Sequence, residues 1–580
     1  MSRRVFHPVV VFACAVGVTH SAAQVSAQAR TAQFGQSGIR SPDSAAVVRR
    51  ARNLQANFER QRRQLLPRFY TDAPTRCVIV GRFCHSDSDR SEEVVIPEEG
   101  NKIRRARTQL LRGLEEAAAA LPGDEWIVGQ RVRYHVEARD TLAVGIARAC
   151  VATRWWCDAL TGYALHAQGD FAGADSSFSL ALDGMPPATR CHWINVAPLL
   201  DTDRREYRRM PCDRREALVT RIWWLADPLL MTPGNERRTE HFSRVMHTTL
   251  LQKDALSTFG ISWGGDLAEL TVRFGWPEKW TQQPSPSAYP GTRPSVTGHE
   301  REPAFHFFPV RWPPDSVHGV ADSLWKIDEN EPREMYAPPY ARTFAPLDAQ
   351  LARFRRGDST LLVAAYDVSD DTLFRQRKFT AGLIAMRDEA TPATLTAVAE
   401  APVRHVMTVS TPWKSQLIGV ELLASDSAAA ARWRSGFGEI PLEADRISLS
   451  DLLFVDGTVL PDDLANAIPQ AHGGTVFRRD AKVGLFWEIY GTAPADSTLP
   501  VSLTISPLET GRLRAALGLL RIASKATPLN IRWQENGAAG MLSARAVMLD
   551  LSLVPPGKYE VRLEIGATPA ARTSKVIRIR

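Results

Sequence analysis

Lysine is scarce in this 580-residue chain. Only 10 of its 71 basic residues are Lys and 61 are Arg, and the arginines are interleaved with acidic residues rather than gathered into one stripe. A nucleic-acid-binding protein usually concentrates its positive charge on one face. The formal net charge of +7 falls to about +5 when the two positive charges of Arg3 and Arg4, in a leader segment, are set aside. We therefore expect no nucleic acid among its partners.

Hydrophobic runs long enough to cross a membrane are also missing. Val9–Val18 is an apolar stretch of about ten residues, whereas a bilayer-spanning helix needs about 20. Basic residues before this stretch and small residues after it, up to Ala23, are typical of a secretory signal peptide, which we assign to residues 1–23. Phe12-Ala13-Cys14 is a poor lipobox. We therefore expect export to the periplasm or the extracellular space, without a lipid anchor or a transmembrane span.

Cysteine is absent after Cys212. When Cys14 is removed with the leader, six cysteines remain, all between residues 77 and 212. Six cysteines allow 15 pairings, and closeness in sequence favours three disulfides in an exported protein: Cys77–Cys84, Cys150–Cys157 and Cys191–Cys212. Six residues separate Cys77 from Cys84-His85, too many for c-type haem attachment, and no spacing supports a zinc site. We expect neither a cofactor nor a metal.

Familiar catalytic motifs are missing as well. The chain has neither a Gly-x-Ser-x-Gly nucleophile motif nor a phosphate-binding loop of the Gly-x4-Gly-Lys-Ser/Thr type. His299-Glu300 comes nearest to a zinc-protease motif, but the next histidine is His306, whereas a helix needs its histidines four residues apart to share a metal. Pro303 also interrupts the segment. The sequence assigns no catalytic residue.

The composition, with 44% hydrophobic and 23% charged residues, is typical of a globular protein. At about 150 residues per domain, the length predicts three or four domains. Residues 24–190 have helical periodicity. Within them, Trp155–Pro186 resembles one tetratricopeptide repeat, with Trp126–Cys150 as a degraded copy, because small, aromatic and helix-ending residues stand in register: Gly162, Gly169, Ala174, Phe178, Ala181 and Pro186. Such arrays bind partner proteins in a concave face, and one or two repeats can also simply brace a neighbouring domain.

The block at 191–310 contains Trp263-Gly-Gly-Asp266 and, shortly after it, Arg273-Phe-Gly275-Trp-Pro277. This stretch is similar to the GWxTD motif of the GWxTD-domain proteins, secreted or envelope proteins of Gemmatimonadota- and Acidobacteria-type bacteria. In that family the motif leads into a strand that ends Arg-Tyr-Gly-x-Pro. Ser262 and Gly265 replace the Gly and Thr of the motif, which implies a divergent branch. The family has no assigned activity, so the resemblance implies an α+β architecture and not a mechanism.

Period-two alternation dominates the rest of the chain. Residues 311–350 are rich in proline and predict an extended linker. Alternating segments beyond it predict antiparallel β-sandwiches at 351–465 and 475–580. The Pro-Gly-x-Tyr sequence ending at Tyr559 resembles the start of a late strand in fibronectin- or immunoglobulin-like sandwiches, where the tyrosine ties a corner. The predicted fold class is therefore multidomain α+β, with a helical repeat region, a central α+β domain and C-terminal sandwiches.

One cluster of polar residues in the central block is a candidate site. A histidine oriented by a carboxylate acts as a general base in many enzymes, and an arginine can hold an anion. The alternative is a purely structural role, a buried polar network in which Asp266 pairs with an arginine such as Arg237 or Arg273. The candidate binding or structural residues are Arg237, Arg238, Glu240, His241, Trp263, Asp266, Arg273, Gly275 and Pro277.

Two functional hypotheses follow. The first is a non-enzymatic exported scaffold that binds another envelope protein or a peptide, which the absence of a nucleophile–base motif favours. The second is a hydrolase of envelope polymers with its site in the central block. The hydrolase hypothesis requires His241, Asp266 and Arg273 to converge in an open pocket. Neither hypothesis specifies an oligomeric state.

Overall fold

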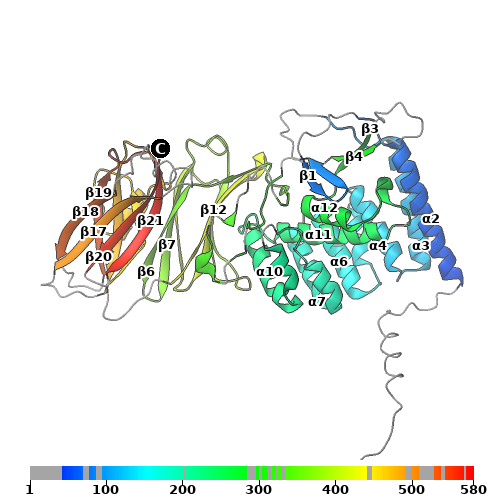
Figure 1. Ribbon diagram of the computed structural model, residues 1–580, viewed down its shortest axis with the longest axis horizontal. Helices are drawn as coiled ribbons and strands as arrows, with labels where there is room; N and C mark the ends of the chain where they lie inside the picture. The colour runs from blue at the N-terminus through cyan, green and yellow to red at the C-terminus, as the bar shows by residue number, and fades with distance from the viewer. Residues whose placement is uncertain are drawn as a thin grey trace, which may run out of the picture.

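The computed structural model places a helical block beside a stack of β-sheets, so that the molecule is elongated (Figure 1). It describes residues 42–580 except for 70–76, 87–94, 201–202, 284–294, 300–303, 311, 314–315, 322–323, 326, 328–332, 440–446, 492–497, 509–527, 537–541 and 567–569. The leader assigned to residues 1–23 lies outside the described residues. None of the helices in the described part of the chain is long and apolar enough to cross a membrane.

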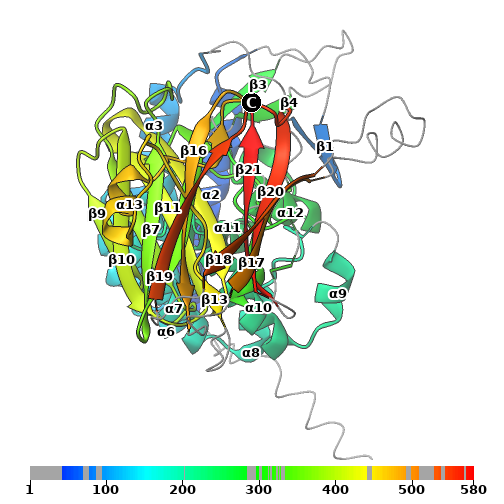
Figure 2. The same cartoon turned by 90° about the vertical axis from the view of Figure 1, so that its left-hand side faces the viewer.

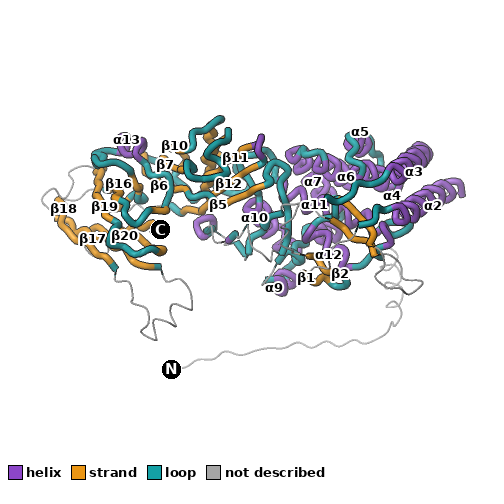
Figure 3. Tube along the Cα trace, turned by 90° about the horizontal axis from the view of Figure 1, so that it is seen from above, coloured by secondary structure: helices purple, strands orange, loops and turns teal. Residues whose placement is uncertain are grey.

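Helices make up most of the block between residues 42 and 274, and two short hairpins lie on its surface (Figure 3). The helices are α2 (Pro42–Leu65), α3 (Asn101–Ala120), α4 (Glu125–Glu137), α5 (Leu142–Arg148), α6 (Arg154–Ala167), α7 (Phe171–Gly184), α8 (Pro187–Trp193), α9 (Arg204–Arg209), α10 (Cys212–Ala226), α11 (Glu236–Gln252) and α12 (Gly265–Phe274), with a 3-10 turn at Thr258–Gly260. The hairpins are β1 (Cys77–Val80) with β2 (Phe83–Ser86), and β3 (Lys279–Gln283) with β4 (Ser295–His299).

All three predicted disulfides are confirmed. Their Cα–Cα distances are 5.3 Å for Cys77–Cys84, 5.5 Å for Cys150–Cys157 and 5.7 Å for Cys191–Cys212. The first closes the β1–β2 hairpin, the second joins the residues around the start of α6, and the third links α8 to the start of α10. The covalent constraints therefore lie in the helical block.

The segment predicted as a repeat is a pair of packed helices, α6 and α7. Gly162 lies so close to the ring of Phe178 that a Cβ atom there would come within 2.9 Å of it. This contact is the small-residue-against-aromatic packing that the spacing predicts. One apolar core runs from Val128 to Phe308 and so includes residues from both the predicted repeat region and the predicted central domain. The helical block is therefore one packed unit across residue 190.

Two expectations for the central block do not match the structure. The family pattern places a strand after the tryptophan motif, but residues 265–274 form helix α12. The helix is consistent with local charge, since Asp266 lies in its first turn and Arg273 in its last. The proline-rich stretch also differs from a free linker, because Val317, Trp325 and Tyr336 are buried against the helical block and the first sheet.

In the described part of the chain, the strands after residue 342 form four sheets in a row (Figures 1 and 2). The first is β5-β12-β11-β8-β9, the second β10-β7-β6, the third β13-β16-β14 with β19 also on β16, and the fourth β15-β21-β20-β17-β18. Their bounds are β5 (Thr343–Pro346), β6 (Ala349–Arg356), β7 (Ser359–Asp367), β8 (Thr380–Met386), β9 (Thr394–Val398), β10 (Arg404–Pro412), β11 (Gln416–Ala424), β12 (Ala429–Phe437), β13 (Ser448–Leu449), β14 (Leu453–Val455), β15 (Val476–Phe477), β16 (Lys482–Tyr490), β17 (Thr498–Pro507), β18 (Leu529–Asn536), β19 (Leu542–Asp550), β20 (Gly557–Ile565) and β21 (Ala571–Ile579), with a short helix α13 (Leu464–Ala467).

Each neighbouring pair of sheets encloses an apolar core. One core lies between the first and second sheets and another between the third and fourth, as expected for two sandwiches. A third core joins the sandwiches, where Phe354 and Val363 of the second sheet meet Leu453 and Phe486 of the third. The hydroxyl of Tyr559 donates to the carbonyl of Pro555 at 2.8 Å, the corner contact that the sequence predicts. The third sheet includes β13 and β14, so the second sandwich begins before residue 475.

Candidate functional site

Helix α11 carries most of the candidate residues through the centre of the helical block. Asn235 caps its first turn by accepting a hydrogen bond from the Arg238 backbone nitrogen at 2.8 Å. Nearly every side chain of the helix is buried, including the charged residues Arg237 and Arg244. Because buried charges are costly unless they are paired, the partners of these residues decide what the helix does.

Glu240 is held by partners on two elements. Its carboxylate accepts from the His166 Nε2 atom of α6 at 2.6 Å and from the Arg244 Nε atom one turn later at 2.5 Å. Burial opposes ionisation, but Arg244 and His166 outweigh it and hold the pKa of Glu240 well below its usual range. Arg244 also donates to the carbonyls of Val272 and Arg273, which end α12. The two residues therefore lock α6, α11 and α12 together.

Arg237 forms a fully buried ion pair with Glu334, at 2.9 Å, from the proline-rich stretch. The same carboxylate accepts from the backbone nitrogens of Phe307 and Phe308 at 2.7 and 2.8 Å. Burial alone would raise the pKa of Glu334, but Arg237, His306 and these hydrogen bonds lower it to about 2. This pair fastens the stretch at 304–342 to the helical block.

His241 lies beside this pair but outside any open pocket. Its ring is fully buried, 4.7 Å from the indole of Trp223 and 5.3 Å from the ring of Phe242. Burial, with Arg237 nearby, lowers its pKa to about 3, so the ring is neutral at physiological pH. Arg238, which follows Arg237 on α11, pairs with Asp175 of α7, and its guanidinium lies 5.0 Å over the Phe242 ring. Both residues pack helices rather than face solvent.

Asp266 pairs with Arg82, at the tip of the disulfide-closed β1–β2 hairpin, and not with Arg237 or Arg273. The Arg82 Nε and Nη2 atoms donate to its two oxygens at 2.6 and 2.7 Å, and the Arg82 backbone nitrogen adds a third bond at 3.1 Å. These bonds hold the pKa of Asp266 well below its usual range. Gly81 lies directly on Asp266, since a Cβ atom there would come within 2.4 Å of the Asp266 Cβ atom. Asp266 and the start of α12 thus form the docking site for the β1–β2 hairpin.

The remaining motif residues end α12 and lead out of it. The Arg273 Nε atom donates to the carbonyl of Arg333 at 2.8 Å. Gly275 has φ +89° and lies under the guanidinium of Arg244, at 3.2 Å from the position of a Cβ atom. Pro277 packs against Gly298 of the β3–β4 hairpin, and Trp263 is half-buried before α12. The structure does not bring His241, Asp266 and Arg273 into one pocket.

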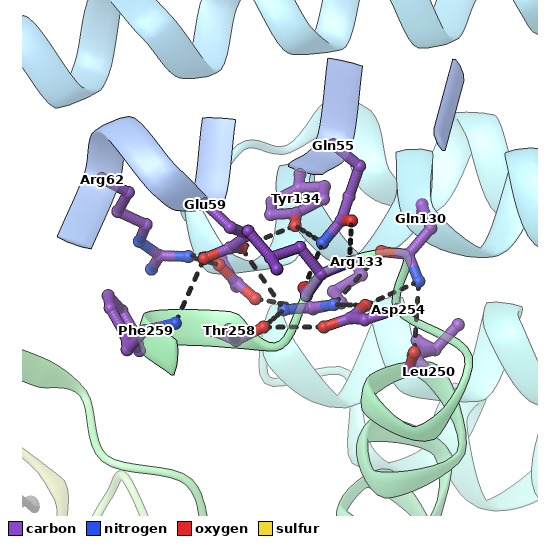
Figure 4. A network of polar contacts seen from close by, with 12 residues as sticks. Gln55, Glu59, Arg62, Gln130, Arg133, Tyr134, Leu250, Asp254, Thr258 and Phe259 are labelled. Carbon is purple, nitrogen blue, oxygen red and sulfur yellow. Dashed lines mark hydrogen bonds and ion pairs between the residues drawn. The ribbon is translucent and has the colours of Figure 1, made fainter. Parts of the chain in front are cut away.

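A second buried network lies where α2 packs on α4 and the segment after α11, and sequence analysis missed it (Figure 4). Arg133 donates to Glu137, Asp254 and Thr258, and Arg62 pairs with Glu137 at 2.8 Å. The hydroxyl of Tyr134 donates to Glu59 at 2.6 Å. The signal was the spacing of polar residues along otherwise apolar helix faces, such as Gln130, Arg133 and Glu137.

Beside this network lies an open cleft of about 920 Å³. It is lined by the ends of several elements: Ser44 and Arg52 of α2, residues 120–126 between α3 and α4, Thr153 before α6, and Gln252 to Asp254 after α11. Two of its lining cations lie over indole rings: Arg52 is 4.9 Å over Trp126, which also lines the cleft, and Lys253 is 4.2 Å over the buried Trp156. Among the described residues no group of three or more His, Cys, Asp or Glu side chains could hold a metal ion.

Comparisons with known proteins assign no family to the chain. No protein-family model matches it, and no curated protein matches it. Matching solved structures include a calcium-binding mutant of Bacteroides uniformis beta-glucuronidase 2 (8% identity, 38% of this chain, 26% of that chain, TM-score 0.13). They also include the native conformation of E. coli alpha-2-macroglobulin (12% identity, 40% of this chain, 16% of that chain, TM-score 0.13). The matched part is thus about a quarter and about a sixth of those chains.

Proposed function

We propose that this protein is a non-enzymatic exported scaffold of the GWxTD type that binds an extended segment of another envelope protein in the cleft between α2, α4 and α11. The cleft is the observation that carries the proposal, because it is an open site of about 920 Å³ built from the ends of several rigid helices. A volume of that order holds several amino-acid residues, and rigid helices position a binding surface with little loss of entropy on association.

The chemistry of the cleft suits a peptide. Arg52 and Lys253 offer cationic groups that already lie over indole faces, so they lose little freedom when a ligand binds. Thr153 and the turn at 120–124 add polar and backbone groups, and Leu121 and Pro122 add apolar surface. The helix pair α6–α7 keeps the likeness to a tetratricopeptide repeat, and under this proposal it braces the wall of the cleft.

A hydrolase is not proposed. That alternative requires His241, Asp266 and Arg273 to share an open pocket. Instead, the ring of His241 is buried, Asp266 binds Arg82, and Arg273 donates to the carbonyl of Arg333. His241 is buried and neutral, and Asp266 is committed to Arg82. No observation on the described residues supplies a nucleophile for a hydrolytic step.

Site-specific photocrosslinking in the native envelope fraction tests the proposal. A photoreactive residue at the exposed Gln252 should capture a defined protein, whereas one at the exposed Leu553 in the last sandwich should not. Replacing Arg52 and Lys253 with Ala should weaken the capture at Gln252. The matched control is Arg49→Ala, which removes an exposed cation one turn away on α2 but outside the cleft. Equal capture at both positions, or capture that survives the double substitution, would contradict the proposal.

A further inference from the structure

The junction between the helical block and the first sheet is built from main-chain groups and buried charges. Arg432 and Arg434 of β12 donate to the carbonyls of Asp227 and Pro228, just after α10, at 2.6 to 3.1 Å. In return, Glu421 of β11 accepts from the backbone nitrogens of Leu230 and Met231 at 3.1 and 2.9 Å. Apolar contacts such as Trp224 with Leu417 surround these bonds. The junction is therefore closely packed, and its charged side chains are buried.

The charges of the described residues in this junction do not balance. Three carboxylates meet there, those of Asp227, Glu236 and Glu421, against the two guanidinium groups of Arg432 and Arg434. Glu421 is satisfied, because Arg434 donates to it at 2.5 and 3.0 Å. All three carboxylate side chains are buried. One negative charge is therefore in excess if every group is ionised.

Among the described residues, the neighbouring groups do not neutralise that charge. Arg237, which follows Glu236 on α11, is committed to Glu334. Tyr340 donates to one oxygen of Glu236, and burial raises the pKa of both Tyr336 and Tyr340 well above the usual range, so the phenols stay protonated. The Asp227 Oδ1 and Glu236 Oε2 atoms are buried and have no hydrogen-bond partner in the described part of the chain. Each could accept or carry a proton.

We propose that the junction is a proton-dependent latch, in which one proton held between Asp227 and Glu236 keeps the helical block docked on the first sheet. Both residues lie at the point where α10 ends and α11 begins, and the segment between them also carries the nitrogens bound by Glu421. Loss of the proton leaves an uncompensated buried charge, which water can stabilise only if the two parts separate. The latch therefore couples pH to the angle and contact between the two halves of the molecule.

The electrostatics give the direction of the pH dependence. Burial raises the pKa of Glu236 to about 7, although the hydrogen bond from Tyr340 lowers it in part. Burial and the nearby Glu236 raise the pKa of Asp227 as well. Since the docked state holds the proton more tightly than the opened state, docking is strongest below the ordinary carboxylate pKa and weakens as pH rises through about 7.

Hydrogen exchange of the whole chain tests the latch. Protection factors, corrected for the intrinsic rate, are measured for peptides covering 227–236 and 416–437 across the neutral range. We expect protection in the unaltered protein to fall by about tenfold or more as pH rises from about 5.5 to about 8.5. Glu236→Gln retains the shape of the side chain but cannot ionise, so its protection should vary with pH by less than about threefold.

Three further variants make the outcome decisive. Tyr340→Phe removes the donor that favours ionised Glu236, so the loosening should move to higher pH. Asp227→Asn should also flatten the pH dependence of protection. Either of the two variants, Asp227→Asn or Glu236→Gln, therefore tests the latch if the other fails to fold. Glu389→Gln alters the partly exposed Arg221–Glu389 pair at the same junction and should keep the profile of the unaltered protein. The same pH dependence in Glu236→Gln and Asp227→Asn overturns the latch. So does a calcium-dependent gain in protection that Glu236→Gln abolishes, since the carboxylates would then bind a cation.

Discussion

At the scale of single residues, Asp266 shows how one carboxylate serves two segments 184 positions apart in sequence. Its oxygens accept from three donors of Arg82 and from the backbone nitrogen of Leu267 at the start of α12. The same side chain thus fastens the β1–β2 hairpin to the first turn of α12. Accepting both guanidinium donors of Arg82 requires two oxygens, which Asn cannot supply.

The first prediction concerns this residue. Asp266→Asn should raise hydrogen exchange in β1 and β2 at neutral pH, because the forked contact with Arg82 is lost. Hydrogen bonds from Arg82 hold the pKa of Asp266 below the ordinary value of 3.8. The stabilisation is therefore complete above that value and disappears as pH falls through the lowered one. Arg82→Lys keeps the charge but not the fork and should give an intermediate effect. Unchanged hydrogen exchange of β1 and β2 in Asp266→Asn would refute the role of Asp266 in holding the hairpin.

Gly275 gives the second prediction. Its φ of +89° with ψ of 175° belongs to a region that residues with a side chain rarely adopt, and the Arg244 guanidinium leaves little space for a methyl group. Gly275→Ala should lower the stability of the helical block by about 1–3 kcal/mol in a denaturant titration. The control is Gly265→Ala at the start of the same helix, where nothing lies within 4 Å of an added Cβ atom. That variant should be neutral or slightly stabilising.

At the scale of elements, the disulfides fix where helices end and begin. The link Cys191–Cys212 closes a segment of 21 residues between α8 and α10, whereas Cys150–Cys157 closes one of seven. Loop-closure entropy makes the longer link worth about 3 kcal/mol and the shorter about 2 kcal/mol. We therefore predict that replacing Cys191 and Cys212 with Ser lowers the denaturation midpoint of the helical block more than replacing Cys150 and Cys157. The reverse order would show that strain or residual structure outweighs the entropy of closure.

Strands and disulfides could be predicted from the sequence, whereas the long-range partners of the buried charges could not. Leu361–Val368 and Val483–Tyr490 are short apolar segments rich in β-branched and aromatic residues, and each coincides with a strand, β7 and β16. The disulfides follow from closeness in the chain. The partners of Asp266 and Arg237 do not, because Arg82 and Glu334 lie far away in sequence and carry no local pattern. Helix α12 was obscured by the family resemblance, although Leu267, Leu270 and Phe274 have helical spacing.

At the scale of the whole molecule, the four sheets and the helical block form a continuous row of packed layers (Figure 1). An apolar core lies between the first and second sheets, between the second and third, and between the third and fourth. The first sheet also shares two smaller cores with the helical block. The proposed cleft lies in the helical block and the proposed latch lies at its junction with the first sheet, so both belong to one continuous set of packed layers. The sequence patterns predict separate sandwiches but not this continuity, since the core between the sandwiches uses residues from both.

The limits of the second sandwich give the last prediction. Its third sheet depends on β13 and β14, which pair with β16 through Leu449–Ile489 and Phe454–Leu485. Leu449, Leu452 and Phe454 also fill the core against Val561 and Leu563 of the fourth sheet. A fragment of residues 447–580 should therefore melt cooperatively with a strong β signal by circular dichroism. A fragment of residues 475–580 lacks both strands, which leaves one edge of β16 unpaired and removes three core side chains, so it should be largely unfolded or aggregated. Cooperative melting of the shorter fragment at the same temperature would show that the sandwich needs neither strand.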